Sequence, residues 1–97
     1  MEAGTKVVVC TNKDRRGVFC GELVDSDIEK GTCTLANARM CVYWSKETRG
    51  VQGLASIGPQ KDSRITPCIP RQELNGVTTI MHCTDTAWSL WEAEPWN

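Results

Sequence analysis

"KVVVCTNKDRRGVFCGELVDSD" (residues 6–27) is the stretch that decides the fold. Its two apolar runs, roughly residues 6–11 and 17–25, are rich in β-branched and aromatic residues and flank the polar segment NKDRRG, a pattern typical of a β-hairpin. Successive residues of a strand face opposite sides of its sheet, and here Val7 and Val9 fall on one side while Val8 and Cys10 fall on the other. Since a sheet with one wet face alternates apolar and polar residues, we expect this sheet to be covered on both faces.

The cover for the second face can come from the end of the chain or from another copy of the protein. Residues 84–94, TDTAWSLWEAE, have the spacing of an amphipathic helix, with Thr84 or Asp85 as a possible cap and Pro95 as a stop. Its apolar side is formed by Ala87, Trp88, Leu90 and Trp91. The four tryptophans of this short chain also favour a homo-oligomer, because aromatic residues gather at interfaces as well as in cores.

The rest of the chain completes a mainly β (α+β) fold. Residues 32–44 form a third extended run, in which we expect a break near Ala38, so that residues 6–44 make a β meander. Residues 45–76 hold most of the later glycines and prolines, and we expect a long ordered loop in which short pieces such as GLASI (53–57) and SRIT (63–66) are extended. With a last strand over 77–83 and a helix over 84–94, residues 1–97 are predicted to form one domain, a small twisted antiparallel sheet or open β-barrel with a C-terminal helix.

Composition agrees with a small folded protein. A chain of 97 residues can bury one modest core, and 40% apolar with 24% charged residues is ordinary for a globular protein. The N-terminus lacks the basic start and long apolar segment of a signal peptide, and no apolar run is long enough to span a bilayer. We therefore expect a cytoplasmic location and no membrane partner.

Six cysteines raise the question of a metal site or disulfides. None of their spacings gives a close CxxC pair, and the one histidine, His82, stands next to Cys83 and not three to five residues from another ligand. Most of the cysteines lie in strand-like apolar runs, where a reduced thiol packs as a small hydrophobe. The sequence predicts no metal site and no cofactor.

Catalysis has little support in the sequence. His82 and Cys83 are neighbours in a predicted strand, so their side chains point to opposite faces and cannot act together as base and nucleophile. The signatures GxSxG, HExxH and the phosphate-binding loop are absent from the 97 residues. We expect a protein that is not an enzyme.

Charge is distributed unevenly, and this points to a binding function. The formal net charge is −1, whereas proteins that coat long nucleic acids carry a strong basic excess. Residues 45–71 have five basic and two acidic side chains, which favours a small anionic ligand. An aromatic ring could stack on a base while hydroxyl and cationic groups hold phosphate. The candidate ligand-binding residues are Tyr43, Trp44, Ser45, Lys46, Arg49, Ser63 and Arg64.

Two questions remain open for these residues. The first is which aromatic residue faces the ligand, because adjacent strand residues face opposite ways and at most one of Tyr43 and Trp44 can meet it. The second is whether both aromatics instead close the core while Arg49 and Arg64 pair with nearby carboxylates at the surface.

Residues 19–38, FCGELVDSDIEKGTCTLANA, resemble the first half of an Sm-like motif, with Gly21, Leu23, Asp27 and Leu35 in similar roles. The resemblance implies a ring-shaped assembly that binds RNA.

A resemblance over nearly the whole chain is to a family of short uncharacterised phage and bacterial proteins. It rests on the strings RGVF (16–19), NARMCVYWS (37–45) and WEAEPW (91–96). A phage origin implies a small oligomeric protein that captures host molecules, including nucleotide-derived defence signals.

Together these observations predict a non-catalytic, phage-type binding protein that sequesters a small anionic, nucleotide-derived ligand and so acts as an anti-defence sponge. The alternatives are an Sm-like RNA-binding ring and a structural or protein-interaction module. RNA binding would require a polymer and would weaken steeply with salt, whereas a sponge would prefer a mononucleotide or cyclic nucleotide.

Overall fold

The structure, a computed structural model, describes residues 4–12 and 17–93. The predicted turn residues 13–16 and the predicted helix stop at Pro95 lie outside the described residues. The elements in chain order are β1 (Lys6–Thr11), β2 (Gly17–Asp27), β3 (Thr32–Tyr43), the 3-10 helix η1 (Lys46–Thr48), α1 (Val51–Ser56), β4 (Arg64–Ile65), β5 (Ile69–Leu74), β6 (Val77–His82) and α2 (Asp85–Ala93).

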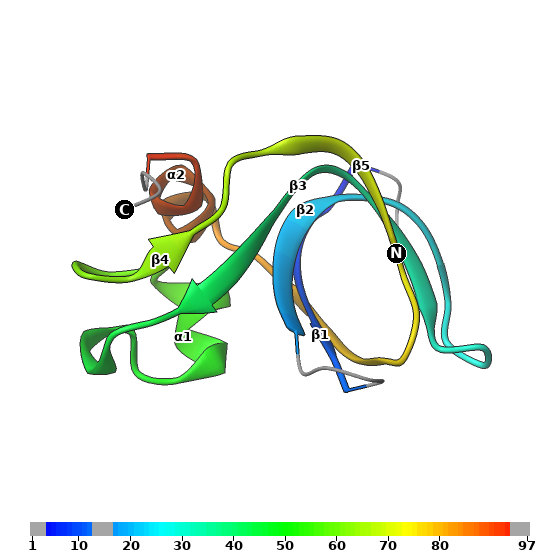
Figure 1. Cartoon of the computed structure of the whole chain (residues 1–97), viewed down its shortest axis with the longest axis horizontal. Helices are drawn as coiled ribbons and strands as arrows, with labels where there is room; N and C mark the ends of the chain where they lie inside the picture. The colour runs from blue at the N-terminus through cyan, green and yellow to red at the C-terminus, as the bar shows by residue number, and fades with distance from the viewer. Residues whose placement is uncertain (1–3, 13–16, 94–97) are drawn as a thin grey trace.

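The strands form one open antiparallel sheet with the order β4-β3-β2-β1-β6 (Figure 1). β5 pairs with the first half of β3, and β4 pairs with its last residues. The β1–β2 hairpin has the register Val8 to Cys20, so the two strands lie where the sequence places them. The prediction of a mainly β fold with an antiparallel sheet and a C-terminal helix is confirmed.

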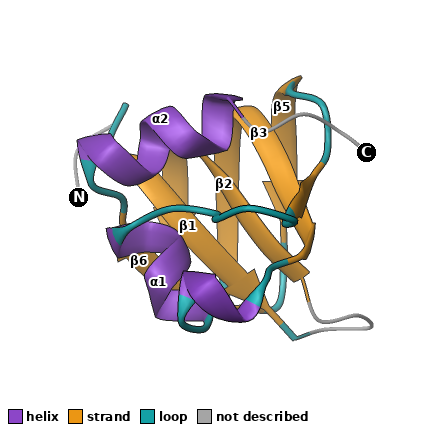
Figure 2. Ribbon diagram, turned by 90° about the vertical axis from the view of Figure 1, so that its left-hand side faces the viewer, coloured by secondary structure: helices purple, strands orange, loops and turns teal. Residues whose placement is uncertain are grey.

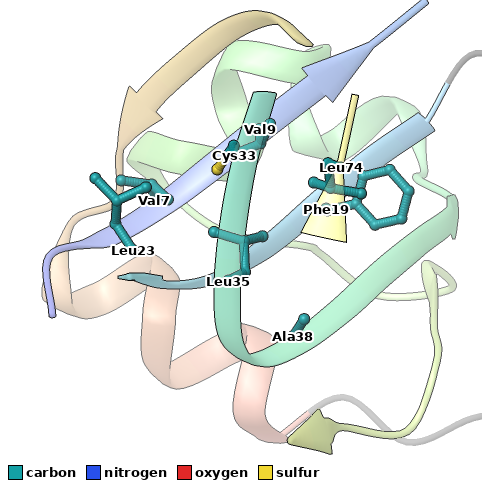
Figure 3. Close-up of a cluster of buried hydrophobic side chains, with 8 residues drawn as sticks. All are labelled: Val7, Val9, Phe19, Leu23, Cys33, Leu35, Ala38 and Leu74. Atoms are coloured by element: carbon teal, nitrogen blue, oxygen red, sulfur yellow. The ribbon is translucent and has the colours of Figure 1, made fainter. Parts of the chain in front are cut away.

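One face of the sheet encloses the first of two apolar clusters. The strands curl around this cluster, and its side chains point toward one another from four strands (Figures 1 and 3). Its buried members are Val7, Val9, Phe19, Leu23, Cys33, Leu35, Ala38 and Leu74. Because they come from strands that are far apart in sequence, this cluster fixes the curvature of the sheet.

The opposite face of the sheet packs against both helices (Figure 2). The second cluster joins Val8 of β1 to Leu54 of α1 and Trp91 of α2. Its other buried members are Cys20, Cys41, Ala55 and Ile65. The second apolar face expected from the sequence is therefore covered within the chain, so this feature does not call for another copy, and the homo-oligomer stays a prediction.

The two helices are joined by hydrogen bonds at the end of α1. A helix leaves its last carbonyls without intrahelical partners, and a helix of six residues cannot persist in water by itself. Here the indole Nε1–H of Trp91 donates to the Leu54 carbonyl at 2.9 Å, and the amide of Thr84 donates to the Ala55 carbonyl at 2.9 Å. The Thr84 hydroxyl donates to the Ser56 carbonyl at 2.8 Å and accepts from the amide of Ala87 at 3.0 Å. Thr84 therefore caps both helices, and of the two predicted caps, Thr84 and Asp85, the structure uses Thr84.

The region predicted as a long loop, residues 45–76, is more regular than expected. It contains η1, α1, β4 and β5, and the piece GLASI, predicted to be extended, lies mostly in α1. The short segment SRIT does contain a strand, β4. Glycine and proline content indicated loop, but the capped carbonyls of α1 and the pairing of β5 with β3 outweigh that local preference.

None of the helices within residues 4–12 and 17–93 is long and apolar enough to cross a membrane.

Candidate functional site

Two of the seven predicted site residues are buried and support the fold. Ser45 and Ser63 are both buried, and the Ser45 amide donates to the Ser63 hydroxyl at 3.2 Å. This bond joins the chain just after β3 to the chain just before β4. Their side chains are therefore removed from the surface where a ligand of the predicted kind would lie.

The two aromatic residues divide as strand geometry requires. Tyr43 is exposed, whereas Trp44 is half-buried and packs against the cluster beneath the helices. Tyr43 is the register partner of Arg64, whose side chain is also exposed. Tyr43 and Arg64 thus lie together at the surface, and Trp44 belongs to the core side.

The remaining predicted residues, Lys46 and Arg49, are exposed on η1 and just after it. Arg49 lines an open hollow of about 610 Å³ beside α1. Its other lining residues are Glu47, Gln52, Gly53, Ser56, Ile57 and Gln60. None of the other six predicted residues lines this hollow, so the structure does not gather the seven into one pocket.

A different pocket, of about 520 Å³, lies between α2 and the sheet and is lined by two cations and two carboxylates. We call it the α2 pocket. Its lining residues are Lys6, Glu22, Asn37, Arg39, Cys68, Trp88 and Glu92. They come from β1, β2, β3, α2 and the segment before β5, so the pocket exists only in the folded chain.

The α2 pocket forms where the helix-covered face of the sheet changes from apolar to polar. On each of three strands a charged residue lies two positions from a buried apolar residue. The pairs are Lys6 and Val8 on β1, Glu22 and Cys20 on β2, and Arg39 and Cys41 on β3. Residues two apart in a strand face the same side, and the registers Lys6 to Glu22 and Cys20 to Arg39 place these charged residues at one end of that face. α2 covers the apolar part, and its residues Trp88 and Glu92, one turn apart, border the polar part.

A β-bulge aims Asn37 toward this pocket. The β2–β3 register shifts between Cys20 and Glu22, and Asn37 has a φ of 51°, a left-handed conformation that asparagine tolerates. Its side-chain nitrogen donates to the carboxylate of Glu22. An ionised carboxylate can only accept hydrogen bonds, so this contact fixes the orientation of the Asn37 amide and restrains Glu22.

Within the described residues, the two cations of the α2 pocket have no carboxylate partner. The Lys6 ammonium lies over the Trp88 ring, 5.6 Å from its centroid, in a cation–π contact. Among residues 4–12 and 17–93, the ion pair formed is Arg71 with Glu73 at the surface, and neither Lys6 nor Arg39 takes part in one. Both groups therefore keep hydrogen-bond donors available to a ligand.

The cysteines occupy both buried and exposed positions. Cys20, Cys33 and Cys41 are buried, Cys10 and Cys83 are half-buried, and all are free thiols. Burial raises the pKa of Cys20 and raises that of Cys83 to about 11, so both are neutral thiols at ordinary pH. Cys68 differs from the buried thiols expected from the sequence, since it is exposed and lines the α2 pocket. Within the part of the chain that the structure describes, no group of three or more histidine, cysteine and carboxylate side chains could hold a metal ion.

Sequence reasoning missed the α2 pocket because its members are spread from Lys6 to Glu92. A signal was nevertheless present: Lys6 and Glu22 are charged residues on strand faces whose neighbouring residues, Val8 and Cys20, are apolar. Such an interruption on a face that must be covered indicates a polar site under the cover.

These features define a small mainly β protein with a polar pocket between its sheet and C-terminal helix. The profile of one family, described as Domain of unknown function (DUF6948), matches residues 4–91. The chain belongs to this family. Comparisons with curated proteins and with solved structures found no significant match.

Proposed function

We propose that the protein is a non-catalytic binding protein that captures a small anionic, nucleotide-derived ligand in the α2 pocket. The observation that carries the proposal is the presence of Lys6 and Arg39 in one pocket of about 520 Å³, neither of them paired with a carboxylate of the described residues. A pocket of this size is suited to a mononucleotide-sized molecule. Guanidinium and ammonium groups are the protein's usual donors to phosphate.

The α2 pocket is open on one side, since its lining residues Asn37, Cys68 and Glu92 are exposed, but it brings Lys6 and Arg39 into one hollow, which favours it over the exposed surface around Tyr43 and Arg64. Lys6 is further positioned by the Trp88 ring, so less side-chain freedom is lost when it contacts an anion. The exposed Lys46, Arg49 and Arg64 would contribute at most a positive potential that attracts an anionic ligand toward the protein.

In the cell, the proposed role is stoichiometric capture in the cytoplasm, of the kind that a phage protein would use against a nucleotide-derived defence signal. The resemblance of the chain to short phage and bacterial proteins supports this role. A homo-oligomer is part of the proposal, and exposed apolar side chains such as Val42 and Ile69 are available for a second copy to cover.

The first test is native mass spectrometry of the protein purified from cells, followed by denaturation to release and weigh any bound molecule. We expect a nucleotide-sized mass in stoichiometric amount, and the intact mass also gives the number of subunits. A ligand-free protein that takes up no mononucleotide or cyclic nucleotide from a cell extract would contradict the proposal.

Matched variants then locate the site. Arg39→Ala removes a cation from the α2 pocket, and Arg49→Ala makes the same change in the hollow beside α1. A charge-assisted hydrogen bond is worth about 1.5–3 kcal/mol, so we expect Arg39→Ala to weaken nucleotide binding about 10-fold or more in isothermal titration. Arg49→Ala should leave it nearly unchanged. The reverse pattern would place binding at the sequence-predicted residues, and binding that requires long RNA and falls steeply with salt would favour an RNA-binding protein instead.

A further inference from the structure

We infer that the α2 pocket selects a guanine nucleotide, with the carboxylate of Glu22 reading the base. This inference rests on the proposed function, because it assigns the base of the ligand whose phosphate Lys6 and Arg39 would hold. It starts from the charge balance of the pocket, where two cations, Lys6 and Arg39, face two carboxylates, Glu22 and Glu92. A simple anion such as inorganic phosphate would meet the carboxylates as well as the cations. A ligand that is anionic at one end and rich in N–H donors at the other satisfies both.

Glu22 is already set to accept hydrogen bonds. The side-chain nitrogen of Asn37 donates to one of its oxygens, and Asn37 is itself fixed by the left-handed turn of the bulge. An ionised carboxylate accepts about four hydrogen bonds, so acceptor positions remain on Glu22 after this contact. A restrained carboxylate with unused acceptor positions in a pocket is an arrangement that recognises a pair of neighbouring N–H donors.

Among the common bases, guanine offers that pair. Its Watson–Crick edge carries the N1–H group next to the 2-amino group, and both can point at one carboxylate. Adenine and cytosine place an acceptor nitrogen beside their amino group, and uracil flanks its single N–H with two carbonyls, so each of these would set an acceptor against Glu22. Hypoxanthine keeps N1–H and lacks the 2-amino group, which makes inosine monophosphate the closest comparison molecule.

Arg39 is the cation that stands apart from Glu22 along the sheet. It is the register partner of Cys20, two residues along β2 from Glu22, whereas Lys6 is the direct register partner of Glu22. The base would therefore lie toward Glu22 and Asn37, and the phosphate toward Arg39. The long Lys6 side chain, which extends over the Trp88 ring, would reach the phosphate from beside the ligand.

The test compares the binding of guanosine, inosine and adenosine monophosphates by isothermal titration. We expect GMP to bind about 10-fold or more tightly than IMP and AMP, since a good bidentate contact discriminates by about this factor. Glu22→Gln keeps the shape of the side chain but places an amino group where an acceptor stood. It should reduce the preference for GMP over IMP to less than about 3-fold. Glu47→Gln, which makes the same change in the hollow beside α1, is the matched control and should leave the preference unchanged.

The outcomes separate this inference from the proposed function. If GMP, IMP and AMP bind equally and Arg39→Ala weakens the binding of all three, the guanine assignment is wrong and the capture site stands. If Glu22→Gln retains the full GMP preference, Glu22 does not read the base. If none of the three nucleotides binds, the guanine assignment is wrong, and the capture site is judged by the mass released from the native protein and by uptake from a cell extract. Should Glu22→Gln not fold, the ratio of GMP to IMP affinity in the unchanged protein decides the question by itself.

Discussion

Replacing Trp91 with phenylalanine tests whether α2 holds α1 in place. The Trp91 side chain is fully buried, and its indole N–H donates to the Leu54 carbonyl of α1 at 2.9 Å. The amides of Ile57 and Gly58 both donate to the preceding carbonyl, that of Gly53, so the indole supplies the donor that the end of this short helix leaves missing. Phenylalanine keeps an aromatic ring in the core but cannot donate.

Two losses add up in this variant. Leaving the Leu54 carbonyl buried without a donor costs about 1–3 kcal/mol. The smaller ring loses packing contacts and leaves a small cavity, which costs about 1–2 kcal/mol more. The free energy of unfolding should therefore fall by about 2–5 kcal/mol, a large part of the roughly 5–15 kcal/mol typical of a small domain.

The assay is urea unfolding followed by circular dichroism, because tryptophan fluorescence would change with the substitution itself. Trp88→Phe is the control, since Trp88 is half-buried and none of the described residues accepts a hydrogen bond from its indole. We expect the free energy of unfolding of the control to fall by less than about 1.5 kcal/mol. The slope of the free energy of unfolding against urea concentration should be unchanged in both variants. A Trp91→Phe protein within about 1 kcal/mol of the unchanged protein, or no less stable than Trp88→Phe, would refute the role given to the indole.

Four further outcomes are expected. Gly58→Ala should lower the free energy of unfolding by about 2 kcal/mol or more, because Gly58 has a φ of 86° and a Cβ there would lie 2.9 Å from the backbone of α2; a neutral result in urea unfolding would contradict this packing. Thr84→Val should cost about 1 kcal/mol in the same assay, because it removes the hydroxyl that caps both helices, and an equal loss in Thr84→Ser would argue against the hydroxyl as the cause. Cys68 should react with a thiol reagent in the native protein at a rate far above that of buried Cys20, and bound nucleotide should slow the reaction if the α2 pocket is the binding site. Stability should fall as the pH rises above about 9, because the folded state keeps Cys20 and Cys83 protonated while the unfolded thiols ionise at their ordinary pKa of 9.0; urea midpoints that stay constant from pH 8 to pH 10 would contradict the raised pKa values.

The fold follows from the sequence wherever the signal is local. β1 and β2 occupy the predicted runs, and α2 begins at the predicted position because Thr84 can cap it. The apolar residues on both faces of β1 correctly indicate two cores, one on each side of the sheet. Strand alternation and helical spacing are properties of neighbouring residues, so they can be read before the chain folds.

The elements that the sequence did not predict depend on distant partners. α1 is too short to form alone, and the residues that cap its carbonyls lie at Thr84 and Trp91. β5 contains Pro70, which argues against a central strand, but among the described strands β5 pairs only with β3, and an edge strand tolerates proline.

The sequence by itself determined a mainly β chain with two apolar faces and a C-terminal helix, because periodicity decides which side of each element is buried. From the uneven charge along the chain it also predicted binding residues between Tyr43 and Arg64, which the structure does not gather into one pocket. Only the tertiary structure decided that Ser45 and Ser63 are buried and that Lys6, Glu22, Arg39 and Trp88 share a pocket. Strand register and helix docking bring those four residues together, and both are set by contacts between segments that the linear order keeps apart.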